Sequence, residues 1–372
     1  MSAAGFLGGL FASRHIQQFS IIGLLHGIGW ARAVLACLMI PPLSWQHPAA
    51  LILLLVALFV FSFIGAWYSP LRFALLPLLV SRDEYVRANG TTSLIHQVLQ
   101  FAGWAAGGLL VSHVAAPAIL GIASGGFLLS GLLSKRIASK GQPASGKPRP
   151  ARLVVPLWKK MYQIPLIRTI TLMDLLETLA NAIWSTALLL AFTKTVLGKN
   201  EEWWGLLNGA YFIGAVIGSY AAVSAAKLLQ RKTGIMIGVS AFCMGILTAL
   251  FALSPLPIVA FLLCLGMGPF YQIRDICQET VLQDALEEAE RAPMLAAREA
   301  ILAPWAGMSY VIMGYLADLT SIATVYLLAA GLYLFSFVLF VSQSAARAYR
   351  FSPDPPSPVQ TESPAKRDKP AS

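Results

Sequence analysis

The chain has 372 residues, of which 57% are hydrophobic and only 12% are charged, and its mean hydropathy is +0.69. Soluble globular proteins carry about 25% charged residues, so this composition excludes the water-soluble enzyme classes. A formal net charge of +10 is compatible with nucleic-acid binding, but the basic residues lie in short segments between long apolar blocks. This distribution favours a membrane protein with basic loops and no nucleic-acid partner.

Ten apolar segments are each long enough to cross a bilayer core of about 30 Å as a helix. They cover approximately residues 19–41, 49–80, 91–112, 114–134, 166–193, 203–226, 233–254, 256–280, 299–317 and 321–343. The stretch from Ser2 to Ala12 would reach only about 16 Å as a helix, which predicts a partial span. A signal peptide is the alternative, but no basic residue precedes this stretch.

The basic residues give the chain a sidedness. Twenty-three of the 27 Lys and Arg residues fall in segments that ten alternating spans place on one side. By the positive-inside rule this side is the cytoplasm, and the C-terminus lies there as well. The same pattern predicts four regions: an N-terminal bundle (1–134), a basic cytoplasmic linker (135–165), a C-terminal six-helix bundle (166–345) and a disordered tail (346–372).

The two halves contain matching segments. The stretch from Phe101 to Gly107 is similar to the stretch from Leu302 to Met308 at an offset of 201 residues, and Arg72 parallels Arg274. Chance similarity of small-residue helices is the alternative explanation, because Ala and Gly are abundant in packed membrane helices. A duplicated bundle around a basic linker is the plan of one large class of transporters.

Three motifs carry a resemblance to a known family. They are Tyr68-Ser-Pro-Leu-Arg72 with the apolar run to Val80, then Val86-Arg-Ala-Asn89, then Gly103 to Gly108. Together they resemble the fourth and fifth helices of major facilitator superfamily transporters, above all the branch of enterobactin and macrolide exporters. The resemblance runs over nearly the whole chain and implies an all-α polytopic membrane protein with two helical bundles, here with ten complete spans plus one partial.

The chain departs from the family pattern in three places. The family has twelve spans, so we expect this chain to lack the first helix and part of the second. The family's Asp-Arg loop motif is represented by Ser13-Arg14, and its Gly-Pro motif of the fifth helix by Gly103-Trp104. The resemblance implies a multi-pass protein of the bacterial inner membrane that exports a small hydrophobic or amphipathic compound in exchange for protons.

Two carboxylates fall inside a predicted span, where an ionisable group costs at least about 2.5 kcal/mol and therefore indicates function. Asp174, Glu177 and Asn181 are spaced i, i+3 and i+7 and share one helix face. Two close carboxylates cannot easily both ionise in a low dielectric, so we expect Asp174 and Glu177 to form the proton-coupling site. The alternative is a structural role, with bonds to the linker or to Arg168.

A second group of polar residues is predicted to line a substrate cavity. Amide and aromatic side chains suit amphipathic organic substrates, because rings supply contact area and a few polar groups orient the ligand. Arg32 lies too deep in its span to reach the cytoplasmic surface easily; a packing ion pair or outward snorkelling is its alternative role. The predicted cavity residues are Arg32, His96, Gln97, Gln100, Asn181, Asn208 and Tyr211.

Charged residues near the cytoplasmic ends of two spans predict a gate. Asp275 and Glu279 are spaced i, i+4 and follow Arg274, and Arg72 occupies the equivalent place in the first half. We expect Arg72, Arg274, Asp275 and Glu279 to form a charge network that closes the cytoplasmic side in one state of alternating access.

Together these patterns predict a monomeric secondary transporter with a small-molecule substrate, protons and the lipid bilayer as its partners. No cofactor is expected, since no glycine pair is followed by the Lys-Ser or Lys-Thr of a nucleotide-binding loop. The four cysteines stand singly in apolar runs, so no metal site is expected either. Two alternatives stay open: a non-transporting remnant or sensor derived from a transporter, and an intramembrane enzyme, although no loop collects a catalytic cluster.

Overall fold

The computed structural model describes residues 2–45, 47–138, 154–343 and 349. Every regular element in these ranges is a helix. The α-helices are α1 (Ser2–His15), α2 (Ile21–Leu38), α3 (Pro48–Gly65), α4 (Tyr68–Leu79), α5 (Tyr85–His113), α6 (Ala116–Ala138), α7 (Val154–Gln163), α8 (Pro165–Asn181), α9 (Thr186–Thr195), α10 (Glu201–Ser224), α11 (Ala226–Arg231), α12 (Thr233–Leu253), α13 (Pro257–Ala285), α14 (Glu288–Leu319) and α15 (Ile322–Ser342). Short 3-10 helices lie at η1 (Ile16–Gln18), η2 (Pro41–Ser44), η3 (Arg82–Glu84) and η4 (Ala182–Trp184).

The helix boundaries follow from local sequence. Apolar segments in lipid must satisfy their backbone hydrogen bonds internally, which a helix does. The free N–H groups at the start of α2 are capped by Ser20, whose hydroxyl accepts a hydrogen bond from the N–H of Gly23 at 3.0 Å. Proline occupies the first turn of α3, α8 and α13, where no N–H is needed.

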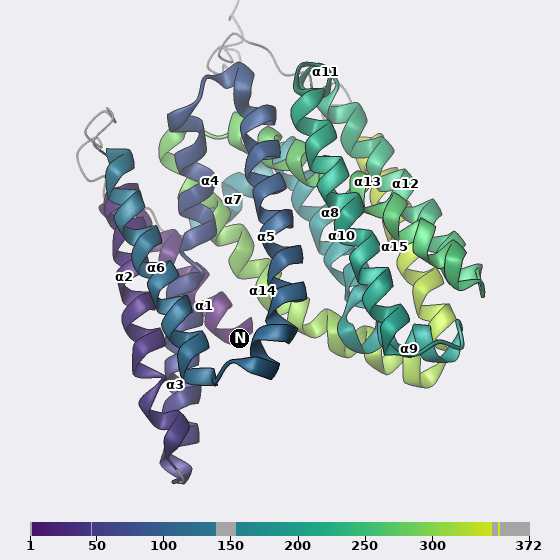
Figure 1. Ribbon diagram of the computed structural model, residues 1–372. Helices are drawn as coiled ribbons and strands as arrows, with labels where there is room; N and C mark the ends of the chain where they lie inside the picture. The colour runs from purple at the N-terminus through teal and green to yellow at the C-terminus, as the bar shows by residue number, and fades with distance from the viewer. Residues whose placement is uncertain (1, 46, 139–153, 344–348, 350–372) are drawn as a thin grey trace, which may run out of the picture.

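The helices form two bundles, as predicted (Figure 1). In the first bundle, α1 to α6, α2 packs against α6 and α3. In the second bundle, α8 to α15, α10 packs against α13 and α12 packs against α13 and α15. The bundles meet where α1 and α4 pack against α14 and where α5 packs against α10. The predicted all-α fold of two bundles is therefore confirmed.

Helices occupy all ten apolar segments, and α1 occupies the eleventh, shorter one. By length and composition, eight helices of the described residues could cross a membrane, or nine if α8 and α9 count as one bent span. The total of ten complete spans therefore stays a prediction. Helix α1 has 14 residues and a length of about 21 Å, less than the hydrocarbon core of a bilayer.

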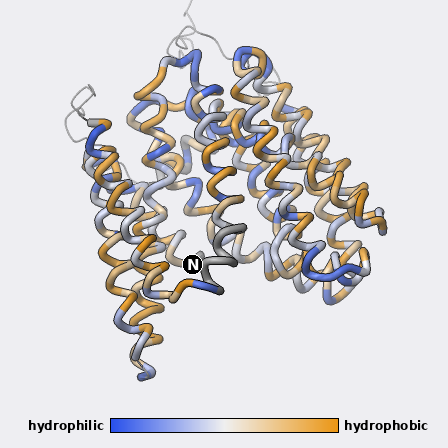
Figure 2. Tube along the Cα trace, in the orientation of Figure 1, coloured by the Kyte–Doolittle hydropathy of each residue, from blue (hydrophilic) through white to orange (hydrophobic). Residues whose placement is uncertain are grey.

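Apolar residues predominate along the helices of both bundles, as the orange segments of Figure 2 show, and many large apolar side chains are exposed. Only 6% of the most apolar window of the α3–α4 segment is buried in the protein, against 50% for α12. Acyl chains are as apolar as leucine, so such surfaces need no protein partner in a bilayer. Buried aromatic rings gather in the second bundle, where Phe192, Phe251 and Tyr326 pack with centroids 4.6 to 5.5 Å apart.

One predicted span is broken. The predicted span 166–193 consists of two helices, α8 and α9, which are bent by 52°. The cause is local, because η4 is followed by Ser185, whose extended backbone (φ −60°, ψ 152°) interrupts the helix. The Ser185 hydroxyl then accepts a hydrogen bond from the N–H of Leu188 at 3.4 Å and starts α9.

The interval predicted as a linker contains structure at both ends. Helix α6 runs to Ala138, and α7 places Leu157 and Met161 in the core of the second bundle. Residues 139–153 lie outside the described part of the chain. The predicted disordered tail also lies outside it, except for Tyr349.

Close contact between α10 and α13 gives a prediction about stability. A Cβ atom added to Gly214 would lie 2.1 Å from the carbonyl oxygen of Leu265, whereas one added to Gly209 on the same helix meets nothing within 4 Å. We expect Gly214→Ala to lower the free energy of unfolding by about 1–3 kcal/mol through overpacking. Gly209→Ala should be neutral or stabilising by up to about 1 kcal/mol, because alanine has the higher helix propensity. Thermal unfolding in detergent measures both; equal midpoints would contradict the packing.

Candidate functional site

A cavity of about 1150 Å³ lies between the bundles, toward the lower end of the molecule in Figure 1, where α9 lies. We call the opposite end, at which α6 ends and α10 meets α11, the linker end. Most of the cavity wall comes from the second bundle, and α5 of the first bundle contributes two residues. The lining residues are Gln100, Phe101, Asn181, Trp184, Ser185, Thr186, Ala187, Leu188, Leu189, Trp204, Gly205, Leu207, Asn208, Gly209, Tyr211, Phe212, Met244, Cys264, Tyr271, Tyr310 and Gly314.

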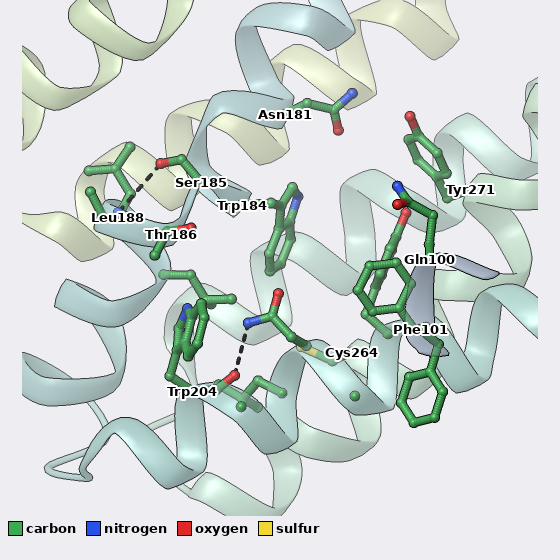
Figure 3. A pocket seen from close by; sticks show the side chains of 18 of the residues that line it. Gln100, Phe101, Asn181, Trp184, Ser185, Thr186, Leu188, Trp204, Cys264 and Tyr271 are labelled. Atoms are coloured by element: carbon green, nitrogen blue, oxygen red, sulfur yellow. Dashed lines mark hydrogen bonds between the residues drawn. The ribbon is translucent and has the colours of Figure 1, made fainter. Parts of the chain in front are cut away.

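The cavity wall combines aromatic rings with amides, as Figure 3 shows for Trp184, Trp204, Tyr271, Asn181 and Gln100. None of these lining residues is Asp, Glu, Lys, Arg or His. The bend between α8 and α9 brings the end of α8 and the start of α9 to the wall together. This environment favours a ligand with extensive apolar area and few polar groups.

Hydrogen bonds fix the polar groups of the wall. Tyr333 donates to the Oδ1 atom of Asn181 at 2.5 Å and accepts a longer bond from the Nε1 atom of Trp184 at 3.4 Å. Asn208 donates from Nδ2 to the carbonyl oxygen of Trp204 at 2.9 Å. The indole N–H of Trp204 is buried and has no acceptor among the described residues. It is therefore a donor that a ligand could satisfy.

A buried ion pair lies behind this wall. The Nη1 atom of Arg274 on α13 is 2.6 Å from the Oε2 atom of Glu177 on α8, and the two side chains are only 4% and 2% exposed. Ser336 on α15 donates to the other carboxylate oxygen at 2.8 Å. The guanidinium of Arg274 lies 5.0 Å from the ring centroid of Tyr271, which lines the cavity. The pair thus joins three helices of the second bundle and reaches the cavity through one aromatic ring.

The second predicted carboxylate has a different partner. Asp174 forms an ion pair with Arg298 of α14, away from the Glu177 pair. The structure therefore gives the two carboxylates separate arginines in place of the shared site that their spacing predicts. Arg168, the alternative partner, lies with its guanidinium 5.2 Å from the ring centroid of Tyr162.

Polar contacts join the bundles on the linker-end side of the cavity. Arg72 on α4 is 2.8 Å from Glu279 on α13. Ser69 donates to Glu299 on α14 at 2.7 Å. Deeper in the molecule, Gln97 on α5 donates to the side-chain oxygen of Gln272 at 2.8 Å.

Asp284 at the end of α13 is the centre of another cluster. It accepts hydrogen bonds from Arg82 of η3 and from Tyr349. Burial and the adjacent carboxylate raise the pKa of the Tyr349 phenol, so the phenol stays protonated and donates. Nearby, Asn89 on α5 donates to Gln283 at 2.7 Å. We call the pairs Arg72–Glu279, Arg82–Asp284 and Asn89–Gln283 the linker-end gate.

The structure brings four of the seven predicted cavity residues together at the cavity: Gln100, Asn181, Asn208 and Tyr211. Arg32 instead lies between the rings of Phe61 and Phe127, with its guanidinium carbon 4.1 and 4.6 Å from their centroids. Inside the first bundle, cation–π contacts therefore take the place of an ion pair for this arginine.

The other two predicted cavity residues lie on α5 above the cavity. His96 is exposed and is not among the lining residues. Gln97 bonds across to α13 at the bundle contact. Of the three predicted residues on α5, Gln100 is the one that lines the cavity.

The four predicted gate residues divide between two places. Arg72 and Glu279 form a pair between the bundles, whereas Arg274 turns into the second bundle toward Glu177. Asp275 lies exposed on α13 between these two pairs. Sequence reasoning missed the partners Arg298, Asp284 and Tyr349. These partners lie far apart in the sequence from the residues they pair with, so the local spacing of residues gave no signal for them.

The comparisons with known proteins agree with this architecture. The family model of the Major Facilitator Superfamily matches residues 1–273. An uncharacterized MFS-type transporter of Bacillus subtilis, YjbB, is 41% identical over 350 residues, covering 94% of this chain and 86% of the relative. A second one, YfmI, is 32% identical over 314 residues, covering 83% and 77%.

Solved structures share the fold at low sequence identity. A bacterial homologue of the iron transporter ferroportin, in an outward-facing state, superposes with a TM-score of 0.74 at 15% identity over 92% of this chain and 87% of its own. The fucose:proton symporter of E. coli gives 0.69 at 15% identity over 91% and 89%. With its two bundles and its extensive match to the family model, this chain belongs to the Major Facilitator Superfamily of membrane transport proteins.

Proposed function

We propose that the protein is a secondary transporter that exports a small hydrophobic or amphipathic compound in exchange for protons, by alternating access. The observation that carries the proposal is one large cavity with bundle contacts on its linker-end side. Alternating access requires such a site to be exposed at one end while polar contacts close the other. The basic loops favour a cytoplasmic linker end, so this conformation would be outward-facing in a bacterial inner membrane.

The wall of the cavity supports this substrate class. Its rings supply contact area, and the Trp204 N–H and the amides of Asn181 and Asn208 supply a few orienting hydrogen bonds. The lining has no charged side chain that would bind a strongly ionic solute tightly. The predicted kinship with enterobactin and macrolide exporters agrees with this substrate class and remains part of the proposal, as does a monomeric state.

The cavity can be tested through one polar group of its wall. Asn208→Leu removes the wall amide at nearly constant volume, and we expect it to reduce export of an amphipathic dye such as Nile red about tenfold, equal to about 1.4 kcal/mol of binding. Everted vesicles report the export as dye uptake. Asn200→Leu, in the loop before α10 and outside the cavity, is the control. Uptake that is absent in every variant and in the native chain, despite normal insertion, would favour a non-transporting sensor.

Glu177 is the stronger of the two predicted coupling carboxylates. It is almost fully buried, and its partner Arg274 contacts the cavity wall at Tyr271. A proton arriving at Glu177 would release Arg274 from its ion pair and alter that wall. Asp174 pairs further from the cavity, with Arg298, and we assign it a structural role in the second bundle.

This assignment predicts that a change at Glu177 affects transport driven by a pH gradient but not exchange at equal pH. Glu177→Gln should abolish dye accumulation driven by a pH gradient but retain dye exchange at equal pH, because exchange needs no net proton transfer. Asp174→Asn, the control on the same helix, should retain both modes. Removing one partner of a buried pair can cost about 3–5 kcal/mol, so the thermal midpoint of each variant is measured as well. Gradient-driven accumulation that survives in a folded Glu177→Gln protein would contradict the coupling role.

The linker-end gate gives a test by charge exchange. Arg72→Glu places two carboxylates together and should favour separation of the bundles at this end, which reduces transport about tenfold. The double variant Arg72→Glu/Glu279→Arg restores opposite charges and should recover most of the activity. Reversal of Glu279 alone should match the effect of Arg72→Glu. A double variant as poor as either single one would show that the pair does not act as a gate.

A further inference from the structure

A second pocket, of about 570 Å³, lies at the linker end, apart from the cavity and the gate. Arg87 of α5 forms one wall, and residues 223–228 at the junction of α10 and α11 form the other. One wall therefore belongs to each bundle. The α5 backbone approaches closely here because Gly90 has no side chain: an added Cβ would lie 3.1 Å from the Cγ2 atom of Val223.

The charges of this pocket are not balanced. Arg87 and Lys227 are exposed, and neither forms an ion pair with a carboxylate in the described part of the chain. Asp83 and Glu84 precede Arg87 on η3, where Glu84 accepts a hydrogen bond from Ser81 at 3.0 Å. Two cations facing one pocket from different helices repel each other unless an anion lies between them.

The pocket also lies where a membrane surface is expected. Span α10 ends at Ser224, which lines the pocket. Two apolar side chains next to it, Tyr220 and Leu228, are 64% and 55% exposed. Tyrosine is enriched at the boundary between acyl chains and headgroups. The apolar side chains therefore lie where acyl chains are expected, and the basic side chains lie where headgroups are expected.

We propose that this pocket binds the phosphate headgroup of an anionic phospholipid of the cytoplasmic leaflet. The guanidinium of Arg87 offers two parallel N–H donors to the phosphate, and Lys227 adds a point charge. The Ser224 hydroxyl supplies a further donor. The acyl chains lie along Tyr220 and Leu228.

A bound headgroup also acts on conformation. Because Arg87 and Lys227 belong to different bundles, the lipid holds α5 and the α10–α11 junction together and stabilises the state closed at the linker end. This second part rests on the proposed function, since it needs bundles that separate at this end. The binding itself does not depend on transport.

The binding is measured on the purified full chain in phosphatidylcholine nanodiscs with increasing phosphatidylglycerol. We expect phosphatidylglycerol to raise the thermal midpoint of the native chain. Arg87→Gln/Lys227→Gln should weaken the apparent affinity about 30-fold, given the contribution of each basic residue at an anionic surface. Arg14→Gln/Lys135→Gln removes the same charge elsewhere and should leave the affinity unchanged.

Several outcomes would overturn the site. These are no stabilisation by phosphatidylglycerol, an equal loss in the Arg14/Lys135 control, or equal stabilisation by inorganic phosphate, which would identify a soluble anion as the occupant. If the double variant does not fold, Ser224→Phe fills the pocket without changing charge. It should also abolish the stabilisation, and full stabilisation of this variant would count against the site.

The effect on conformation is measured separately. Ser93 lies between the bundles, with its hydroxyl 3.3 Å from that of Ser219. Ser93→Cys is made in a chain whose native cysteines are replaced, and labelled with a charged maleimide from the linker-end side. A lipid that binds the closed state tenfold more tightly than the open state lowers the labelling at position 93, which occurs in the open state, by up to about tenfold. If phosphatidylglycerol binds but does not change the labelling, the proposed effect of the lipid on conformation is overturned. The lipid site and the transport proposal would both stand.

Discussion

Contacts between the two bundles at the linker end are the interaction on which the rest of the molecule depends. They lie on one side of the cavity, between it and the linker end. The contacts are small and polar: Arg72 with Glu279, Asn89 with Gln283, and Arg82 with Asp284. The two ion pairs, Arg72–Glu279 and Arg82–Asp284, keep some exposure to solvent, and pairs of this kind contribute little net stability, since water replaces them at low cost. In the proposed alternating access, a gate built from such pairs would hold one state and still open.

The ion pair inside the second bundle is buried and, unlike the contacts between the bundles, costly to separate. Glu177 and Arg274 are almost wholly removed from solvent, so separating them without a proton or a new partner is expensive. In the proposed alternating access, the bundle around them would therefore move as one body. The predicted internal repeat gives Arg72 and Arg274 equivalent positions, and in the structure the two make different contacts. Arg72 pairs with Glu279 of the other bundle, whereas Arg274 pairs with Glu177 of its own bundle.

Sequence patterns predicted the parts of this structure that depend on the solvent. Lipid selects long apolar segments, so helices occupy every predicted segment. Four of the predicted cavity residues line one pocket, and their role in binding a substrate stays a prediction. The failures concern pairing in three dimensions. Spacing put Asp174 and Glu177 on one face, but the partners Arg298 and Arg274 come from helices about 100 residues away. Likewise, nothing in the local pattern distinguishes Gln97 at the bundle contact from Gln100 at the cavity.

The two bundles contribute unequally to the cavity wall, and this bears on how access to the cavity could change. Nearly all lining residues belong to the second bundle, and the first contributes Gln100 and Phe101 of α5. In the proposed function, a ligand bound there would be held mainly by the second bundle and covered by the first. Rotation of the first bundle would then change access without dismantling the binding contacts, because Asn181 and Asn208 are fixed by Tyr333 and by the Trp204 backbone of the same bundle. Under this proposal the second bundle would set the affinity for the ligand and the first bundle would set access to it. The Glu177–Arg274 pair lies inside the second bundle, where protonation of Glu177 would change the affinity.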